Sequence, residues 1–580
     1  MKKYIFICMI FVFLHFAHAQ DSFFDDSDFD NESANSETGQ SLSSNFEFSG
    51  FAALGIRFYP HPDLKRAEAV PNFGINLKHS SSKTEIDSHF KFNMRTILEY
   101  PLDFIDECTM RAYLGDFVLS TGKMKLVWGR GDMLHVLDVF NANDFTDFTI
   151  PSYIDRRIGE PMIHLAYNAP IPLRLEAAWT PLMTPDRVSL KGHWIPSQIE
   201  EVKQKLSSTL FDGILLDLFP SQKIENIMYT TIKDTLTAIT SPPANITVNF
   251  PVLSDEEIDQ ISSQFNSLQK PVIKAILKSL SGKPITIDIS GTLTEDKINE
   301  IAEKESKKYT KFIIEEFKTS LQKAGTIIQN FDLDPFIKIG MNSFLPDMNQ
   351  IKYGQYGLRL SGSLGPTDMA CQYYFGHYKT PSIDVSAMVE KAMSGGNIRD
   401  CVYYDPIHIF GIDFGAAIFM FNFRSEAAYY MSYDFKGNNP AVHNNSIQWV
   451  LGFDVDIPLN NINLNIQNIG SYILGFKNVK ENNKNGFIDM DWNKAEKASN
   501  NKLIVNISDS WLHENLSDSI TIIWGIEHND AVIMPKIKYR IKDEFYVEGT
   551  GAYIYAKDKK SEFASWKNNH FVQLSFEYHF

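Results

Sequence analysis

The sequence predicts an all-β fold, an antiparallel barrel that crosses a membrane, and the last ten residues, 571–580, carry the clearest evidence. Apolar residues occupy every second position of this segment from Val572 to Phe580, and polar residues alternate with them. A strand with this period of two has one apolar and one polar face. Its length matches the roughly 9–11 residues that a tilted strand needs to cross the hydrocarbon core of a bilayer.

The N-terminal end supports the same fold class, because it predicts export from the cytoplasm. Lys2 and Lys3 precede an apolar run from Tyr4 to Phe16, and Ala17-His18-Ala19 follows as a small-x-small cleavage site. This pattern predicts a signal peptide over residues 1–19, cleaved before Gln20. The apolar run is too short for a permanent transmembrane helix.

Composition narrows the class of the exported chain. Aromatic residues make up 13% of the sequence, and no run of eighteen apolar residues follows the signal peptide. Loss of two signal-peptide lysines changes the formal charge from −16 to −18, which excludes nucleic acid as an expected partner. Three cysteines remain, Cys108, Cys371 and Cys401, so a disulfide framework is excluded, and a Cys371–Cys401 bridge is left open.

Alternating segments recur on both sides of the middle of the chain. One face of residues 84–100 is mostly charged or polar, and the other face is mostly apolar. Lipid outside the barrel and water inside it satisfy both faces. Tight turns at 364–368, 416–417 and 458–461 alternate with longer polar connections. The strands expected are 46–59, 84–100, 107–128, 161–168, 172–180, 354–363, 369–378, 406–415, 418–433, 446–457, 461–475, 502–511, 517–528, 532–541, 544–556 and 571–580. They predict about 16 strands, with a range of 14–18, because 107–128 is long for a single strand and a hairpin there would break the even count.

Several of these segments resemble a known family. TMRAYLGDF (109–117), GKMKLVWGRGD (122–132) and HIFGIDFG (408–415) are similar to hairpins of poorly characterised, porin-like outer-membrane barrels of Gram-negative bacteria. The aromatic residues Phe576, Tyr578 and Phe580 resemble the C-terminal signal that the barrel-assembly machinery of such bacteria reads. The resemblance covers residues 45–180 and 350–580 and implies an integral protein of the cell outer membrane, in contact with its lipid.

The middle of the chain has a different period. Ile199, Val202, Leu206 and Leu210 fall on one helical face, and similar patterns follow from Ile258 and Ile313. Residues 246–261 align with 285–301, each a short β-branched strand, a polar turn and a capped helix, which predicts two related strand-helix units unless the capping chemistry is convergent. The domains expected are a signal peptide (1–19), an acidic disordered leader (20–44), the first part of the barrel (45–185), a mainly helical α/β insertion (186–334) and the second part of the barrel (335–580).

No catalytic, metal-binding or cofactor motif stands out, so we expect no enzyme, no metal and no cofactor. His61, His89 and His408 lie on polar strand faces, where solvation is the expected role. Arg130-Gly131-Asp132 matches a short adhesion motif, but we expect the two charges to pair near the barrel mouth or to fold inward. We expect Trp128 to anchor at a membrane interface.

The polar strand faces hold the remaining functional signal, because they are relatively rich in basic residues for so acidic a chain. Rings of basic residues favour anions in a pore. The sequence therefore predicts a porin-like channel for small polar solutes, with a preference for anions, unless the mixed charges pair and only stiffen the barrel. The alternative is a surface-displayed structural or adhesive protein whose barrel anchors the insertion; the oligomeric state is left open. The pore-lining residues expected are Arg57, Lys91, Arg95, Arg359, Arg424, Lys536, Lys538, Arg540 and Glu548.

Overall fold

The structure is a computed structural model, which divides into two compact units. The first unit is described over residues 45–61, 67–93, 100–147, 153–189, 193–196, 350–383, 400–439, 442–482 and 497–580, with a few single positions between these ranges. The second is described over 221–239, 245–249, 254–262, 284–289, 293–308 and 398–399, again with a few single positions. The expected signal peptide and acidic leader lie outside the described residues.

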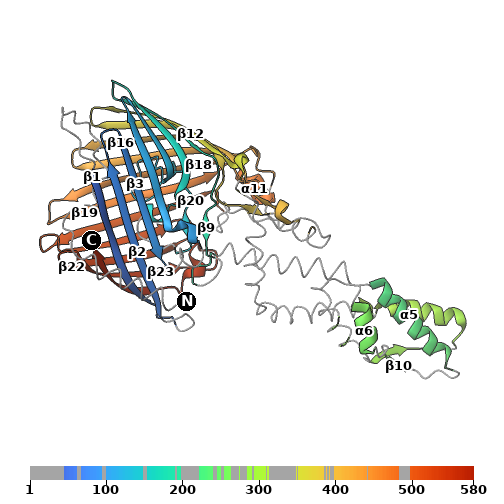
Figure 1. Cartoon of the computed structure of the whole chain (residues 1–580). Helices are drawn as coiled ribbons and strands as arrows, with labels where there is room; N and C mark the ends of the chain where they lie inside the picture. Colours follow the sequence, from blue (N-terminus) through green and yellow to red (C-terminus); the bar gives the residue numbers. More distant parts are fainter. Residues whose placement is uncertain are drawn as a thin grey trace. The chain divides into compact units, whose positions relative to one another are not determined.

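The first unit is a closed antiparallel β-barrel of 18 strands (Figure 1). Each strand pairs with the next one along the ring, and β24 closes the ring by pairing with β1. The barrel strands are β1 (Asn45–Phe58), β2 (Ala67–Ser80), β3 (Thr84–Asn93), β4 (Ile105–Leu114), β5 (Phe117–Met124), β7 (Glu160–Asn168), β8 (Leu173–Thr180), β12 (Gln355–Leu364), β13 (Thr367–His377), β16 (Pro406–Ile418), β17 (Phe421–Met431), β18 (Ser446–Ile457), β19 (Ile462–Ile473), β20 (Ser499–Trp511), β21 (Leu516–Gly525), β22 (Asp530–Lys542), β23 (Phe545–Ala556) and β24 (Phe571–His579).

The prediction of about 16 strands is close, and the two missing strands have identifiable causes. The stretch 107–128 is a hairpin of β4 and β5, joined by a turn at Gly115-Asp116. Strand β2 was not predicted because its apolar alternation is weak. Its outward residues at 67 and 69 are alanines, and Pro71 and Gly74 interrupt the segment. The two omissions together keep the strand number even. The turn expected at Ala416-Ala417 is also wrong: both residues belong to β16, and the turn is Phe419-Met420.

Alternation decides which face of each strand points outward. In β24, Val572, Leu574 and Phe576 are exposed, whereas Gln573 and Ser575 make contacts on the inner face. Leu358 and Leu360 of β12 and Ile412 of β16 repeat this pattern on the far side of the ring. Among the described residues, no helix is long and apolar enough to cross a membrane.

The two ends of the barrel carry connections of different length. Turns of two to four residues join β2 to β3, β4 to β5, β7 to β8, β12 to β13, β16 to β17, β18 to β19, β20 to β21 and β22 to β23 at the end where the chain termini lie. Most connections at the other end are longer. Two of them are residues 125–159 and the segment between β8 and β12, which contains most of the second unit.

The second unit contains helices and a small sheet. Its named elements are α5 (Ser221–Thr237), β10 (Asn245–Asn249), α6 (Asp255–Ser262) and β11 (Pro284–Asp288), and residues 295–308 are helical. Strands β10 and β11 pair antiparallel, and each is followed by a helix in the order that the two repeated segments predict. Helix α5 was not predicted, and the helices expected from Ile199 and Ile313 lie largely outside the described residues.

Candidate functional site

The candidate site is the connection between β5 and β7, residues 125–159, which we name the inner loop. Its described residues, 125–147 and 153–159, contact inward-facing side chains of β1, β3, β13, β16, β17 and β19. The inner loop therefore lies inside the barrel and narrows its lumen. A polar loop inside a barrel is feasible because the inner strand faces supply hydrogen-bond partners that lipid could not.

A single carboxylate on β17 holds the first part of the inner loop. Glu426 Oε1 accepts hydrogen bonds from the backbone N–H groups of Arg130 (2.6 Å) and Gly131 (2.7 Å) and from Nδ1 of His135 (2.8 Å). Its Oε2 accepts from the backbone N–H groups of Val136 (2.7 Å) and Leu137 (3.1 Å). The Glu426 side chain is fully buried, so these five donors replace its entire hydration. We refer to this arrangement as the Glu426 cradle.

The glycines of the WGRGD segment make the cradle sterically possible. Gly129 has φ +116°, a conformation that residues with a Cβ rarely adopt. A Cβ at this position would also lie 2.3 Å from Glu426 Oε1. The backbone can therefore approach the carboxylate closely only with glycine at residue 129.

The two charges of the RGD triplet bind the barrel wall rather than each other. Arg130 donates to Asp413 Oδ1 (2.9 Å) and to Asp368 Oδ2 (3.1 Å). Asp132 pairs with Arg424 and accepts from Asn465 Nδ2 (2.8 Å). The two charges were expected either to pair with each other near the barrel mouth or to fold inward. The structure shows that they fold inward.

Trp128 packs inside the barrel, so its expected role as a membrane-interface anchor is wrong. Its ring lies perpendicular to that of Phe140 at a centroid distance of 5.0 Å, and Phe140 meets Tyr374 of β13 in the same way at 5.2 Å. All three rings are almost completely buried. Gly357 of β12 makes room for them, since a Cβ there would lie 2.4 Å from Phe140.

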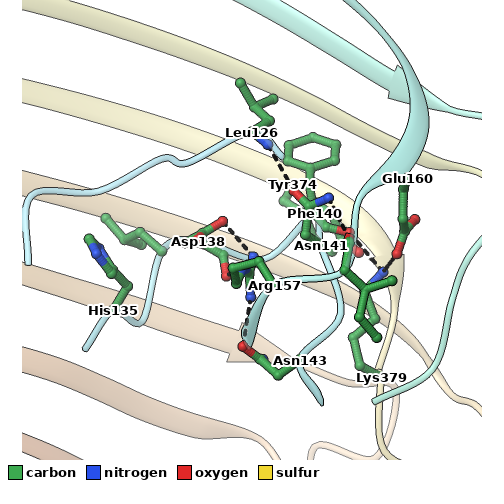
Figure 2. Close-up of polar contacts among 12 residues, drawn as sticks. Leu126, His135, Asp138, Phe140, Asn141, Asn143, Arg157, Glu160, Tyr374 and Lys379 are labelled. Carbon is green, nitrogen blue, oxygen red and sulfur yellow. Dashed lines mark hydrogen bonds and ion pairs between the residues drawn. The ribbon is translucent and has the colours of Figure 1, made fainter. Parts of the chain in front are cut away.

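A buried lysine fastens the middle of the inner loop to the barrel (Figure 2). Lys379, which follows β13, donates to the backbone carbonyl of Phe140 (2.8 Å), to Gln355 Oε1 (2.8 Å) and to Glu160 Oε1 (3.2 Å). Gln355 Nε2 in turn donates to Glu160 Oε2 (2.8 Å), and the Tyr374 hydroxyl donates to Gln355 Oε1 (2.6 Å). Burial lowers the pKa of Lys379, and Glu160 opposes this effect.

The base of the inner loop is held by Asn141 and Arg157 (Figure 2). Asn141 Oδ1 accepts from the backbone N–H of Leu126 (2.8 Å), and its Nδ2 donates to the carbonyl of Ile158 (2.9 Å), so one side chain bridges the two ends of the loop. Arg157 Nη2 donates to Asp138 Oδ1 at 2.6 Å. Burial raises the pKa of Asp138 to about 6, although the neighbouring Arg157 and His135 lower it.

This pKa gives a prediction for stability against pH. Because the folded-state pKa of Asp138 is raised above 3.8, its contribution to stability is fully present below pH 4 and is lost as the pH rises through about 6. In the Asp138→Asn variant, residue 138 has no ionisable side chain. From pH 4 to pH 7 we therefore expect the free energy of unfolding of the unmodified protein to fall by about 2–3 kcal/mol relative to that of the variant. Urea unfolding of both proteins in lipid vesicles at the two pH values measures this difference, and an unchanged difference would contradict the raised pKa.

The predicted pore-lining residues lie on inner strand faces, and most of them are ion-paired. Arg57 binds Asp147 of the inner loop (2.7 Å) and stacks over Phe571, and Lys91 binds Asp155 (3.1 Å). The other contacts are Arg359 to Asp413 (2.7 Å), Arg424 to Asp132, Lys536 to Glu548 (3.1 Å), Lys538 to Glu577 (2.8 Å) and Arg540 to Asn515 (2.7 Å). Arg95 lies outside the described residues. Whether these residues line a conducting pore stays a prediction.

Other candidate residues have ordinary roles in the described structure. His89 contacts Asp87 (2.9 Å). His408 lies on the outward face of β16 with Phe410 and Ile412, so its expected place on a polar strand face is wrong, and it contacts the hydroxyl of Tyr373 (2.8 Å). Cys371 and Cys401 form no disulfide with each other, and Cys108 forms none either. Among the described residues, no group of three or more His, Cys, Asp or Glu side chains could hold a metal ion.

Sequence reasoning did not find the inner loop, the Glu426 cradle or the Lys379 contacts. One signal was available: residues 125–159 separate two strand segments without any alternation of their own, and they contain three glycines and several acids. Such a segment could have been assigned to a folded loop, but nothing local identifies Glu426, which lies 296 positions from Arg130.

Comparison with known proteins gives similarity at the level of structure alone. No protein-family model matches the sequence, and no curated protein matches it. Among solved structures, the chain is similar to a BenF-like porin from Pseudomonas fluorescens Pf-5, with 6% identity, a TM-score of 0.40 and coverage of 93% of this chain and 98% of that chain. It is also similar to OccAB3 of Acinetobacter baumannii (9% identity, TM-score 0.37, coverage 93% and 99%) and to the outer membrane protein opdK of Pseudomonas aeruginosa (8%, 0.39, 93% and 98%). These scores are low, and the description of the barrel rests on the strand pairing of this chain.

Proposed function

We propose that the barrel spans the outer membrane of a Gram-negative bacterium, with its short turns on the periplasmic side. The outward face supports this proposal, because it is apolar and carries aromatic residues toward both barrel ends. The exposed outward aromatics near the short turns include Phe46, Phe48, Trp511, Tyr539, Phe545 and Tyr578, and those near the long connections include Trp179, Tyr356, Tyr472, Trp524, Tyr553 and Tyr555. Aromatic girdles on either side of an apolar band are typical of membrane barrels. Recognition of Phe576, Tyr578 and Phe580 by the barrel-assembly machinery stays a prediction.

The function that this geometry supports best is the passage of small polar solutes through the lumen. The observation that carries the proposal is the inner loop, which charged and polar residues of the barrel wall hold inside a closed barrel. A polar lumen gives water and solutes a path, and a fixed loop limits the size of what passes. Exclusion of enzymatic activity stays a prediction.

The preference for anions is the finer part of this proposal. The basic row Lys536, Lys538 and Arg540 projects from one face of β22, but Glu548 and Glu577 neutralise the two lysines. We therefore expect the preference for anions in the unmodified channel to be small.

The test is single-channel recording of the full chain in planar bilayers under a salt gradient. Stepwise conductance is expected, and its absence would overturn the proposed function. The triple variant has glutamate in place of Lys536, Lys538 and Arg540. It should shift the reversal potential toward cation selectivity, because Glu548 and Glu577 also lose their partners. The matched control, Lys436→Glu, Lys477→Glu, Lys480→Glu, carries three reversals in the long connections outside the strands. If both variants have the same reversal potential, the basic row does not determine the ion selectivity of the channel.

A further inference from the structure

One sector of the lumen wall is neutral and polar. On β19, β20 and β21, the inward positions toward the short turns carry amide and hydroxyl side chains in cross-strand register: Asn465 pairs with Asn506, and Asn506 pairs with Thr521. Asn465 identifies this face as inward, because its Nδ2 reaches Asp132 of the inner loop. We name this sector the amide wall, and its members are Asn463, Asn465, Gln467, Asn506, Ser508, Ser510, Ser517, Ser519 and Thr521.

The amide wall differs from two other sectors of the lumen wall, in which opposite charges form ion pairs. On β12 and β16, Arg359 binds Asp413, and on β22 and β23, Lys536 binds Glu548. A solute that binds a charged group in these sectors has to compete with an ion pair. The amide wall has no charged member, so a neutral solute can bind there without breaking an ion pair and without losing the hydration of a net charge.

Two acceptors of the amide wall have no hydrogen-bond donor among the described groups. Asn465 and Gln467 direct their amide nitrogens to Asp132, at 2.8 and 3.2 Å. This leaves Asn465 Oδ1 and Gln467 Oε1 buried without a partner, and Gln467 as a whole is only 2% exposed. A buried acceptor without a donor is unfavourable, so a ligand that supplies O–H donors at this place is favoured.

We propose that the amide wall binds uncharged polyhydroxylated solutes, such as mono- and disaccharides, beside Asp132. A hydroxyl group both donates and accepts, so it can donate to Asn465 Oδ1 and accept from a neighbouring hydroxyl or amide. Neither an organic anion nor an organic cation finds an unpaired counter-charge within the amide wall. This inference rests on the proposed function and names the solute class of the same lumen.

The experiment uses the full chain in planar bilayers with sucrose as the probe. Sucrose should interrupt the ion current at lower concentration than a polyethylene glycol of the same hydrodynamic size, which offers few hydroxyl donors. The wall variant is Asn506→Leu with Thr521→Val. These two side chains bond to each other at 2.8 Å, and replacing both partners by apolar groups of similar shape is nearly neutral for folding. The matched control, Ser361→Ala with Thr550→Val, removes two hydroxyls from inward positions on β12 and β23.

We expect the half-blocking concentration of sucrose to rise about tenfold in the wall variant, as loss of one or two hydrogen bonds implies, and to stay unchanged in the control. The inference is overturned if sucrose and polyethylene glycol block the unmodified channel at the same concentration, or if sucrose blocks the wall variant and the control at the same concentration. In either case, ion conductance by the unmodified protein would leave the proposed function intact. If the unmodified protein conducts no ions, titration calorimetry of sucrose in detergent decides the inference separately. Heat of binding that disappears in the wall variant supports it, and the absence of binding heat refutes it.

Discussion

Replacing Glu426 by alanine is expected to release the inner loop from the barrel wall and to raise the single-channel conductance. The variant leaves four backbone N–H groups, those of Arg130, Gly131, Val136 and Leu137, without their acceptor. Each unsatisfied group costs about 1 kcal/mol, so the wall-bound position of the inner loop is destabilised by on the order of 4 kcal/mol. The loop should therefore leave the wall and bind water. Larger current steps and more open-channel noise in planar bilayers are the measured result.

The matched control for this experiment is Glu548→Ala. Glu548 is also an inward carboxylate, but in the described structure it forms an ion pair with the partly exposed Lys536. This variant should conduct like the unmodified protein apart from a small change in ion preference. If Glu426→Ala and Glu548→Ala give the same conductance, the cradle does not set the width of the lumen.

Replacing Lys379 by methionine should cost about 3–5 kcal/mol of stability, because Glu160 is then a buried charge without its counter-ion. Adding Glu160→Gln should recover much of this loss, since a pair of neutral groups replaces the buried ion pair. Urea unfolding of the three proteins in lipid vesicles measures these differences.

The control for the buried pair is Lys91→Met. Lys91 binds Asp155, whose side chain is 49% exposed, and such pairs contribute at most about 1 kcal/mol. A double variant at 379 and 160 that is no more stable than Lys379→Met alone would show that the loss comes from the hydrogen bonds to Phe140 and Gln355 instead.

The sequence predicts the barrel well and the site poorly, and the difference is one of distance along the chain. Strand β24 follows from alternation within ten residues, because each outward side chain responds to lipid independently of the others. The Glu426 cradle instead depends on a contact between residues 296 positions apart, and a glutamate on a polar strand face gives no local sign of its partners. The same reason explains Trp128: its aromatic ring suits a membrane interface and a buried cluster equally, and only the position of Phe140 decides between them.

Strand β2 shows where even the local pattern fails. Its outward residues near the long connection are Ala67, Ala69 and Pro71, which give little apolar contrast. Pairing with β1 over fourteen positions forms this strand nonetheless, because its neighbours supply a complete ladder of partners. Tertiary context overrides weak strand propensity here.

The closure of the ring has a consequence for the order in which the protein can be made. The backbone N–H of Gly50 donates to the carbonyl of Phe580 (2.7 Å), and the N–H of Phe580 donates to the carbonyl of Gly50 (2.9 Å). The seam between β1 and β24 therefore needs Phe580, which is synthesised 530 residues after Gly50. Until then the first strand has an unpaired edge, which is prone to aggregation. Closure joins residues more than five hundred positions apart, and contacts this distant form slowly. A chain truncated by a few C-terminal residues should accordingly stay an open sheet and be degraded, however complete its other hairpins are.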